Sequence, residues 1–154
     1  MAYTWLLALH SLWRWVVVAA VVGRLARAVG YRSEAYTATD KRLGLAAMIA
    51  LDVQLLLGFG LYAGPSPATA AAFADVGAAM KDASLRFWLV EHTSMMTLAV
   101  VFGHVANIRV RRLTEDAAKH RAAAIFFGLA VLCIALAMPW PFRAVIGRPW
   151  FPGL

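Results

Sequence analysis

Residues 3–23 read YTWLLALHSLWRWVVVAAVVG, and this stretch decides the fold. It is long enough to cross the hydrocarbon core of a bilayer, which takes about 20 helical residues. Its second half, VVVAAVV at 16–22, carries no polar side chain. Comparable apolar stretches recur along the chain. The sequence therefore predicts transmembrane spans at residues 3–23, 43–63, 87–106 and 122–138.

The composition supports an integral membrane protein. The 154 residues are 62% hydrophobic and 15% charged, whereas a soluble domain has about 45–50% and about 25% respectively. A single cysteine excludes an internal disulfide and a cysteine-based metal cluster. We expect one all-α transmembrane domain, an up-and-down four-helix bundle, with an outer loop at 64–84 and a Trp/Pro-rich outer tail at 139–154.

The net charge of +7 is concentrated in two of the expected loops. Because these basic residues lie beside apolar spans, membrane topology explains them better than a nucleic-acid partner does. Cytoplasmic loops are enriched in Lys and Arg, so both loops are predicted to face the cytoplasm and both termini the outer, periplasmic side. The residues are Arg24, Arg27, Arg32, Lys41 and Arg42 in the first loop, and Arg109, Arg111, Arg112, Lys119 and Arg121 in the third.

Two histidines share one depth in the expected bundle. His10 and His92 each lie seven residues inside the outer end of their span, which is about 10 Å at 1.5 Å per residue. The first and third spans run in the same direction and form the diagonal pair of an up-and-down bundle. Two facing imidazoles can hold a haem iron from both sides. The alternative is that each histidine bonds a neighbouring carbonyl, hydroxyl or acidic group.

Other polar residues within the spans also need partners, because an ionisable group in hydrocarbon is costly. Arg14 and Asp52 each lie eleven residues in, which predicts an ion pair between them. Glu91, on the third span, lies within one helical turn of the reach of the Arg14 side chain and could share this pair. Gln54 is a neutral member of the same group of polar residues. Alternatively, Arg14 binds a haem propionate or a quinone carbonyl, and Glu91 carries protons or faces the polar mouth of the bundle.

The remaining candidates are weaker. Methionine and cysteine can bind copper, so His10 and His92 with Met96 and Cys133 form an alternative copper site, although a methionine is more often a core filler. His104 is expected near the inner interface beside Asn107. We expect His120, in a basic loop, to be solvated.

Four segments resemble a family of small four-helix bacterial membrane proteins that are labelled cytochrome b-like. The resemblance implies a multi-pass protein of the bacterial inner (cytoplasmic) membrane that binds haem b through His10 and His92. The family often has histidine where this chain has Asp52, so the second span supplies no ligand here. The segments are HSLWRW at 10–15, DVQLLLGFGLY at 52–62, MKDASLRFWLVEH at 80–92 with Met95 and Met96, and PWPF at 139–142.

Three functions are consistent with these features. The first is a membrane electron-transfer subunit with one b-type haem near the outer face, linked to quinone and to a larger respiratory or photosynthetic complex. The second is a cofactor-free accessory subunit of such a complex, in which the histidines belong to a polar network. The third is a small transporter or a copper-handling protein.

Overall fold

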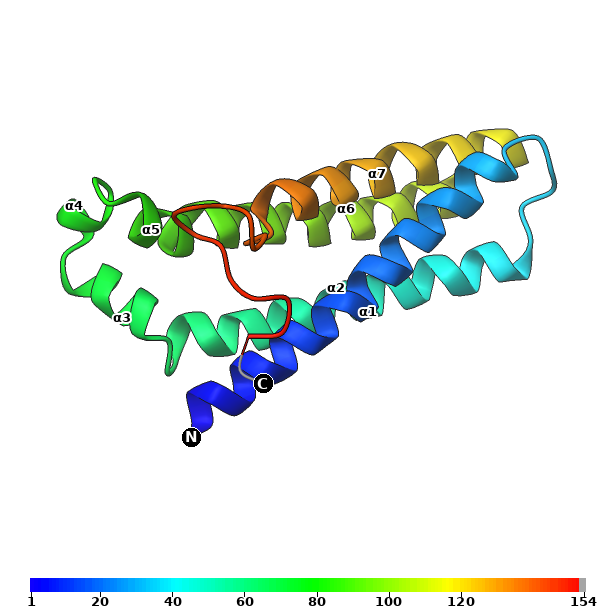
Figure 1. Ribbon diagram of the computed structural model, residues 1–154. Coiled ribbons are helices and arrows are strands. Elements are labelled where there is room, and N and C mark those ends of the chain that lie inside the picture. Colours follow the sequence, from blue (N-terminus) through cyan, green and yellow to red (C-terminus); the bar gives the residue numbers. More distant parts are fainter. Residues whose placement is uncertain (153–154) are drawn as a thin grey trace.

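The structure, a computed structural model, describes residues 1–152 and consists of helices joined by short connections. Its long helices pack side by side as a bundle (Figure 1). Each is long and apolar enough to cross a membrane, when the short segments that precede α6 are counted with it. The prediction of a multi-pass four-helix membrane protein is therefore confirmed. The long helices are α1 (Ala2–Gly30), α2 (Ala38–Ala63), α6 (His92–Arg112) and α7 (Asp116–Ala137).

The helices extend beyond the expected spans chiefly at one end of the bundle. There α1 continues to Gly30, α6 continues to Arg112, and α7 already begins at Asp116. Hydropathy marks only the part of a helix that suits hydrocarbon, whereas the backbone continues as helix through the adjoining basic residues. The connections at this end are consequently short, at residues 31–37 and 113–115.

The order of the helices around the bundle follows from their contacts. Helix α1 packs against α2 and α7, and α6 packs against the same two neighbours. This confirms that the first and third spans, α1 and α6, face each other diagonally across the interior.

Small side chains let α2 and α6 approach closely. A Cβ atom added to Gly103 would lie 2.7 Å from Leu51 Cδ1, and one added to Gly44 would lie 2.7 Å from Asn107 Oδ1. Asn107 closes this contact by donating hydrogen bonds of 3.1 Å to the carbonyls of Gly44 and Gly103. Small residues are typical of helix interfaces in membranes, where close packing replaces the hydrophobic effect.

The connection between α1 and α2 is fixed by a buried carboxylate. Asp40 accepts hydrogen bonds from the backbone N–H of Thr37 at 2.9 Å and from its hydroxyl at 2.8 Å. Arg27, in the last turn of α1, donates to the same carboxylate at 3.1 Å. This capping box begins α2 directly after the turn and attaches it to the end of α1.

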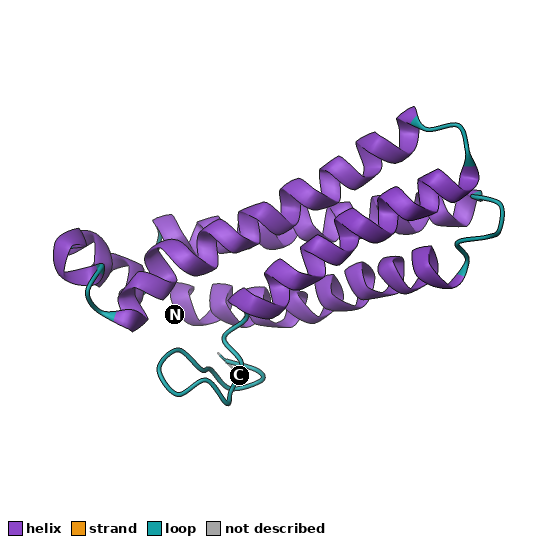
Figure 2. Cartoon of the chain, turned by 90° about the horizontal axis from the view of Figure 1, so that it is seen from above, coloured by secondary structure: helices purple, strands orange, loops and turns teal. Residues whose placement is uncertain are grey.

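The opposite end of the bundle is covered by short helices and the tail. Residues 64–84, expected as a surface loop with one short helix, contain α3 (Pro67–Ala74), α4 (Val76–Ala79) and the start of α5 (Ala83–Arg86). The side chains of Ser66, Asp75 and Asp82 cap these helices. The five-residue π-helix η1 (Phe87–Glu91) then leads into α6. Residues 139–152 contain turns and no helix, and they fold back over this end of the bundle (Figures 1 and 2).

Replacing Gly103 by leucine is expected to destabilise the bundle by about 1–3 kcal/mol, the usual cost of overpacking a tight core. The added side chain must displace Leu51 and separate α2 from α6. The matched control is Gly23→Leu, because no atom of the described residues lies within 4 Å of a Cβ at Gly23. Unfolding in detergent, followed by circular dichroism, measures both variants, and equal stabilities would contradict this account of the interface.

Candidate functional site

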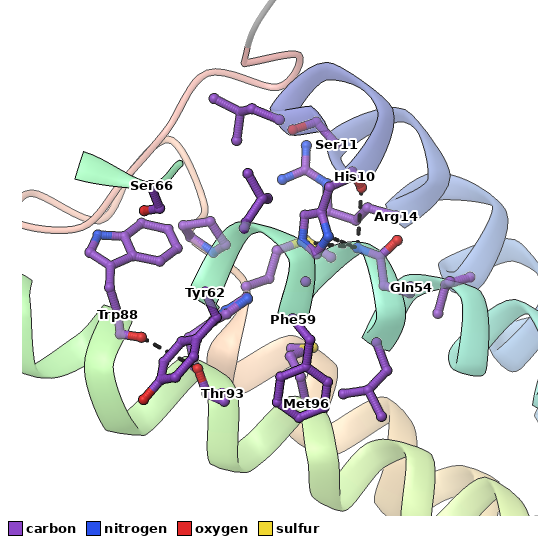
Figure 3. Close-up of a pocket in the computed structure, with 18 of the residues that line it drawn as sticks. His10, Ser11, Arg14, Gln54, Phe59, Tyr62, Ser66, Trp88, Thr93 and Met96 are labelled. Atoms are coloured by element: carbon purple, nitrogen blue, oxygen red, sulfur yellow. Dashed lines mark hydrogen bonds between the residues drawn. The ribbon is translucent and has the colours of Figure 1, made fainter. Parts of the chain in front are cut away.

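A cavity of about 130 Å³ opens between the helices at the end that carries the tail (Figure 3). A single water needs about 10–15 Å³ on the same measure, so the cavity has room for more than one water molecule. Its walls are mainly apolar and come from α1, α2, α6, α7 and the tail. The few polar groups include His10, Arg14, Gln54, His92 and Arg148.

The structure brings the two diagonal histidines together in this cavity. The centres of the His10 and His92 rings lie 6.4 Å apart, and their planes are inclined by 62°. Both residues line the cavity wall. Equal depth on α1 and α6 therefore corresponds to a direct approach of the two imidazoles across the bundle interior.

The His92 ring is held in one orientation by the backbone of α7. Its Nδ1 lies 2.9 Å from the carbonyl oxygen of Ala137. A carbonyl can only accept, so Nδ1 carries the hydrogen and Nε2 has the free lone pair. The rings of Phe87 and Trp88 pack against the imidazole with centre distances of 5.7 and 5.4 Å. The lone pair on Nε2 of His92 is thus free to bind a metal ion or another electrophile.

A π-helical turn sets the direction in which His92 points. The backbone N–H of His92 donates to the carbonyl of Phe87, five residues earlier. The hydroxyl of Thr93 donates to the carbonyl of Trp88 at 3.3 Å. Isolated π turns inside helices often mark functional sites. This turn was not predicted from the sequence, because counting at 1.5 Å per residue assumes a regular α-helix throughout.

His10 is contacted by Gln54 from α2. The amide nitrogen of Gln54 lies 3.1 Å from Nε2 and 3.3 Å from Nδ1 of the imidazole, and it also donates to the His10 carbonyl at 3.1 Å. The Gln54 side-chain oxygen is buried without a hydrogen-bond partner among residues 1–152. A Cβ at Gly58 would lie 3.3 Å from His10 Cε1, so the glycine gives the ring room. Gly60 faces away from His10, and a Cβ there would lie 3.3 Å from Leu6 Cδ2.

The tail brings a second arginine to the cavity. Arg14 donates a hydrogen bond to the carbonyl of Trp150. Arg148 lines the cavity, with its guanidinium 4.6 Å from the centre of the Trp88 ring, and donates to the Tyr3 hydroxyl at 3.4 Å. No sequence pattern indicates this role for Arg148, because the path of an irregular tail follows no periodicity.

The predicted ion pair between Arg14 and Asp52 is wrong. Asp52 instead accepts a hydrogen bond from His104 Nε2 at 2.8 Å, and Glu91 pairs with Arg86 at 2.7 Å. Neither Asp52 nor Glu91 lines the cavity. Equal depth fixes the height of a residue in the membrane and not its direction around the helix. The side chain that points from α2 toward α1 is that of Gln54, two positions after Asp52.

Of the other residues that the sequence offered as metal ligands, one lines the cavity and the others do not. Met96 lines the cavity, whereas Met95 packs against the core. Cys133 is buried and does not line the cavity. Within residues 1–152, no group of three or more His, Cys, Asp or Glu side chains is arranged to hold a metal ion. The expectation that His120 is solvated is wrong, because its side chain is fully buried against Tyr36.

The fold and the cavity define a small multi-pass membrane protein with two imidazoles opposed inside a four-helix bundle. The chain matches no family model, and neither the curated proteins nor the solved structures include a significant match.

Double-mutant cycles can distinguish the observed pair, Asp52 with His104, from the pair predicted from equal depth, Asp52 with Arg14. We expect Asp52→Asn and His104→Ala to be coupled by about 0.6 kcal/mol or more, the average that double-mutant cycles give for hydrogen bonds between transmembrane helices. Asp52→Asn and Arg14→Gln should be additive within about 0.3–0.5 kcal/mol, because the two sites share no partner in the described part of the chain. Unfolding free energies in detergent give both values, and the reverse order of couplings would refute the assignment.

Proposed function

We propose that the protein is a membrane electron-transfer subunit that binds one b-type haem between His10 and His92. The observation that carries this proposal is the approach of the two imidazole rings to 6.4 Å across a mainly apolar cavity. The resemblance to the cytochrome b-like membrane proteins supports the same two ligands. A quinone at the same cavity, exchanging electrons with the haem, is the partner that a membrane location favours.

The spacing of the rings fits a shared metal ion. Imidazole nitrogens bind zinc at about 2.0–2.1 Å, and comparable bonds on opposite sides of an iron place the two ring centres about 6 Å apart. The separation between His10 and His92 is 6.4 Å. Two imidazoles are strong ligands for haem iron and suit one-electron transfer, which is the chemistry that the haem supplies when bound.

The hydrogen bonds of the two rings also fit ligation. Metal-bound histidines usually donate their second N–H to a carbonyl or carboxylate, as His92 does to Ala137. For His10 the corresponding group is Gln54, whose amide has both a donor and an acceptor end. When the amide turns, its oxygen, which accepts from no group within residues 1–152, can accept from Nδ1–H, and Nε2 is then free for the iron.

Two positive charges suit the carboxylates of a haem. Arg14 and Arg148 both line the cavity on the side that the tail covers. Arg14 has a buried Nε without a hydrogen-bond partner in the described range, so it retains capacity to bind an anionic group. These arginines would hold the acidic edge of the macrocycle, while the apolar walls exclude water from its face.

The charge distribution supports an orientation for the electron path. The end of the bundle with the two short connections carries most of the basic residues, and the positive-inside rule assigns it to the cytoplasm. The His10–His92 cavity then lies near the outer face of a bacterial inner membrane. A haem at that depth can exchange electrons between the membrane and a redox partner in the periplasm.

Spectroscopy of the purified protein tests the proposal. The wild type, expressed with haem supply, should show the reduced alpha band of b-type haem and about one haem per chain in a pyridine haemochrome assay. We expect His10→Ala and His92→Ala each to lower haem occupancy at least about tenfold, because loss of a ligand exceeds the loss of a supporting hydrogen bond.

His104→Ala is the matched control, since it removes a histidine of α6 that binds Asp52 outside the cavity. Haem content of this variant should equal that of the wild type. A folded wild-type protein without the alpha band would refute the proposal and favour the cofactor-free accessory role. Equal haem content in all three variants would exclude His10 and His92 as ligands.

Gln54 provides a separate test of how His10 is positioned. Gln54→Leu removes the acceptor for the imidazole N–H and is expected to weaken haem affinity by about tenfold or more. Gln54→Glu keeps an acceptor at the same reach and should retain near wild-type affinity. Titration of the apoprotein with haem measures both. Equal affinities for the leucine and glutamate variants would show that Gln54 does not orient the ligand.

A further inference from the structure

A second pocket lies at the opposite end of the bundle, where the short connections join the helices. It has a volume of about 520 Å³. Its walls come from the start of α2, the end of α6 and the start of α7. Among the described residues, four basic side chains line it and no acidic one does, namely Lys41, Arg42, Arg111 and Lys119.

Most of this charge lacks an internal counterion. Lys119 is paired with Asp116 at 2.7 Å. Lys41, Arg42 and Arg111 form no salt bridge with any residue in the described range 1–152. Like charges around one concavity raise the local positive potential and concentrate anions there. The pocket is therefore a favourable place for an anion, since its three exposed basic side chains have no carboxylate partner among residues 1–152.

A buried arginine adds to this charge from behind the pocket wall. The side chain of Arg24 is fully buried, and its Nη2 donates to the hydroxyl of Tyr36, a wall residue, at 3.0 Å. Within residues 1–152, its Nε and Nη1 have no hydrogen-bond partner and its guanidinium pairs with no carboxylate. The guanidinium lies near the rings of Tyr36 and Phe127. A buried cation of this kind is strongly destabilising unless an opposite charge approaches it.

His120 is a second unsatisfied group at the same place. Its side chain is fully buried, and neither ring nitrogen has a hydrogen-bond partner in the part of the chain that the structure describes. Its ring centre lies 5.1 Å from that of Tyr36. Tyr36 thus separates the basic pocket from two buried groups that have spare N–H capacity.

We propose that this basic pocket binds a phosphate group, carried by an anionic phospholipid headgroup or present as free phosphate. Arginine and lysine are the usual protein partners of phosphate oxygens. Basic pockets between transmembrane helices on the cytoplasmic side accept the headgroups of anionic lipids. The pocket is at the level where the apolar spans give way to short polar connections, which is the level of a headgroup. This inference is independent of haem binding.

The test compares pocket arginines with arginines beside the pocket. The double variant Arg42→Gln, Arg111→Gln removes two wall charges. Its matched control, Arg109→Gln, Arg112→Gln, removes two exposed charges at the same end of α6 that do not line the pocket. Each purified protein, in neutral detergent, is titrated with phosphatidylglycerol, with phosphatidylcholine and with sodium phosphate against sodium chloride at equal ionic strength. Thermal stabilisation and native mass spectrometry measure binding.

We expect the wild type and the control to bind one phosphate-bearing ligand and to agree within about twofold, because Arg109 and Arg112 do not line the pocket and contribute only at longer range. The wall variant should bind about 30-fold more weakly, since two basic residues near an anionic group are lost. Saturation by phosphatidylglycerol alone assigns the site to a lipid, and competition by sodium phosphate assigns it to the free anion. The proposal would be overturned if binding were weakened equally in both double variants. It would also be overturned if phosphatidylglycerol and phosphatidylcholine bound equally well and sodium phosphate had no effect.

Discussion

Hydrocarbon cannot hydrogen-bond a side chain, so each polar group within the spans depends on a partner inside the protein. This constraint accounts for the arrangement of the interior. His92 donates to the carbonyl of Ala137 at the end of α7, and His10 is engaged by Gln54. Both contacts are between neighbouring helices, so they fix rotation as well as separation. Each imidazole is thus held by a group on a neighbouring helix, and the two ring centres lie 6.4 Å apart.

The π turn and the aromatic pair that precedes His92 serve the same geometry. A π turn inserts one residue into a helix, so the residues after the turn are rotated about the helix axis relative to the residues before it. Phe87 and Trp88 lie in that turn and pack on the imidazole they precede. The local loss of regular α-helical hydrogen bonds is partly recovered by the Thr93 hydroxyl.

The sequence was sufficient for the fold class and for the depth of the histidines, because both follow from length and hydropathy along the chain. It was insufficient wherever direction around a helix axis mattered. Arg14 and Asp52 share a depth but point to different neighbours, so Asp52 pairs with His104 on α6 and Arg14 meets the tail. His120 was misplaced for a related reason. Helix α7 begins within the basic segment, which buries a residue that hydropathy assigns to a loop.

The tail has a physical role that its composition alone does not reveal. Irregular backbone is tolerated at membrane depth only where protein buries it or a water-filled cavity adjoins it, and residues 139–152 fold back over the cavity end of the bundle. There the Trp150 carbonyl engages Arg14, and Arg148 sits over the Trp88 ring. The same segment thus supplies positive charge to the cavity and shields its contents from water. Burial and nearby charge are two of the means by which a protein sets the potential of a haem. If the proposed haem binds in this cavity, the charge and cover that the tail supplies would act on its potential without any change of ligand.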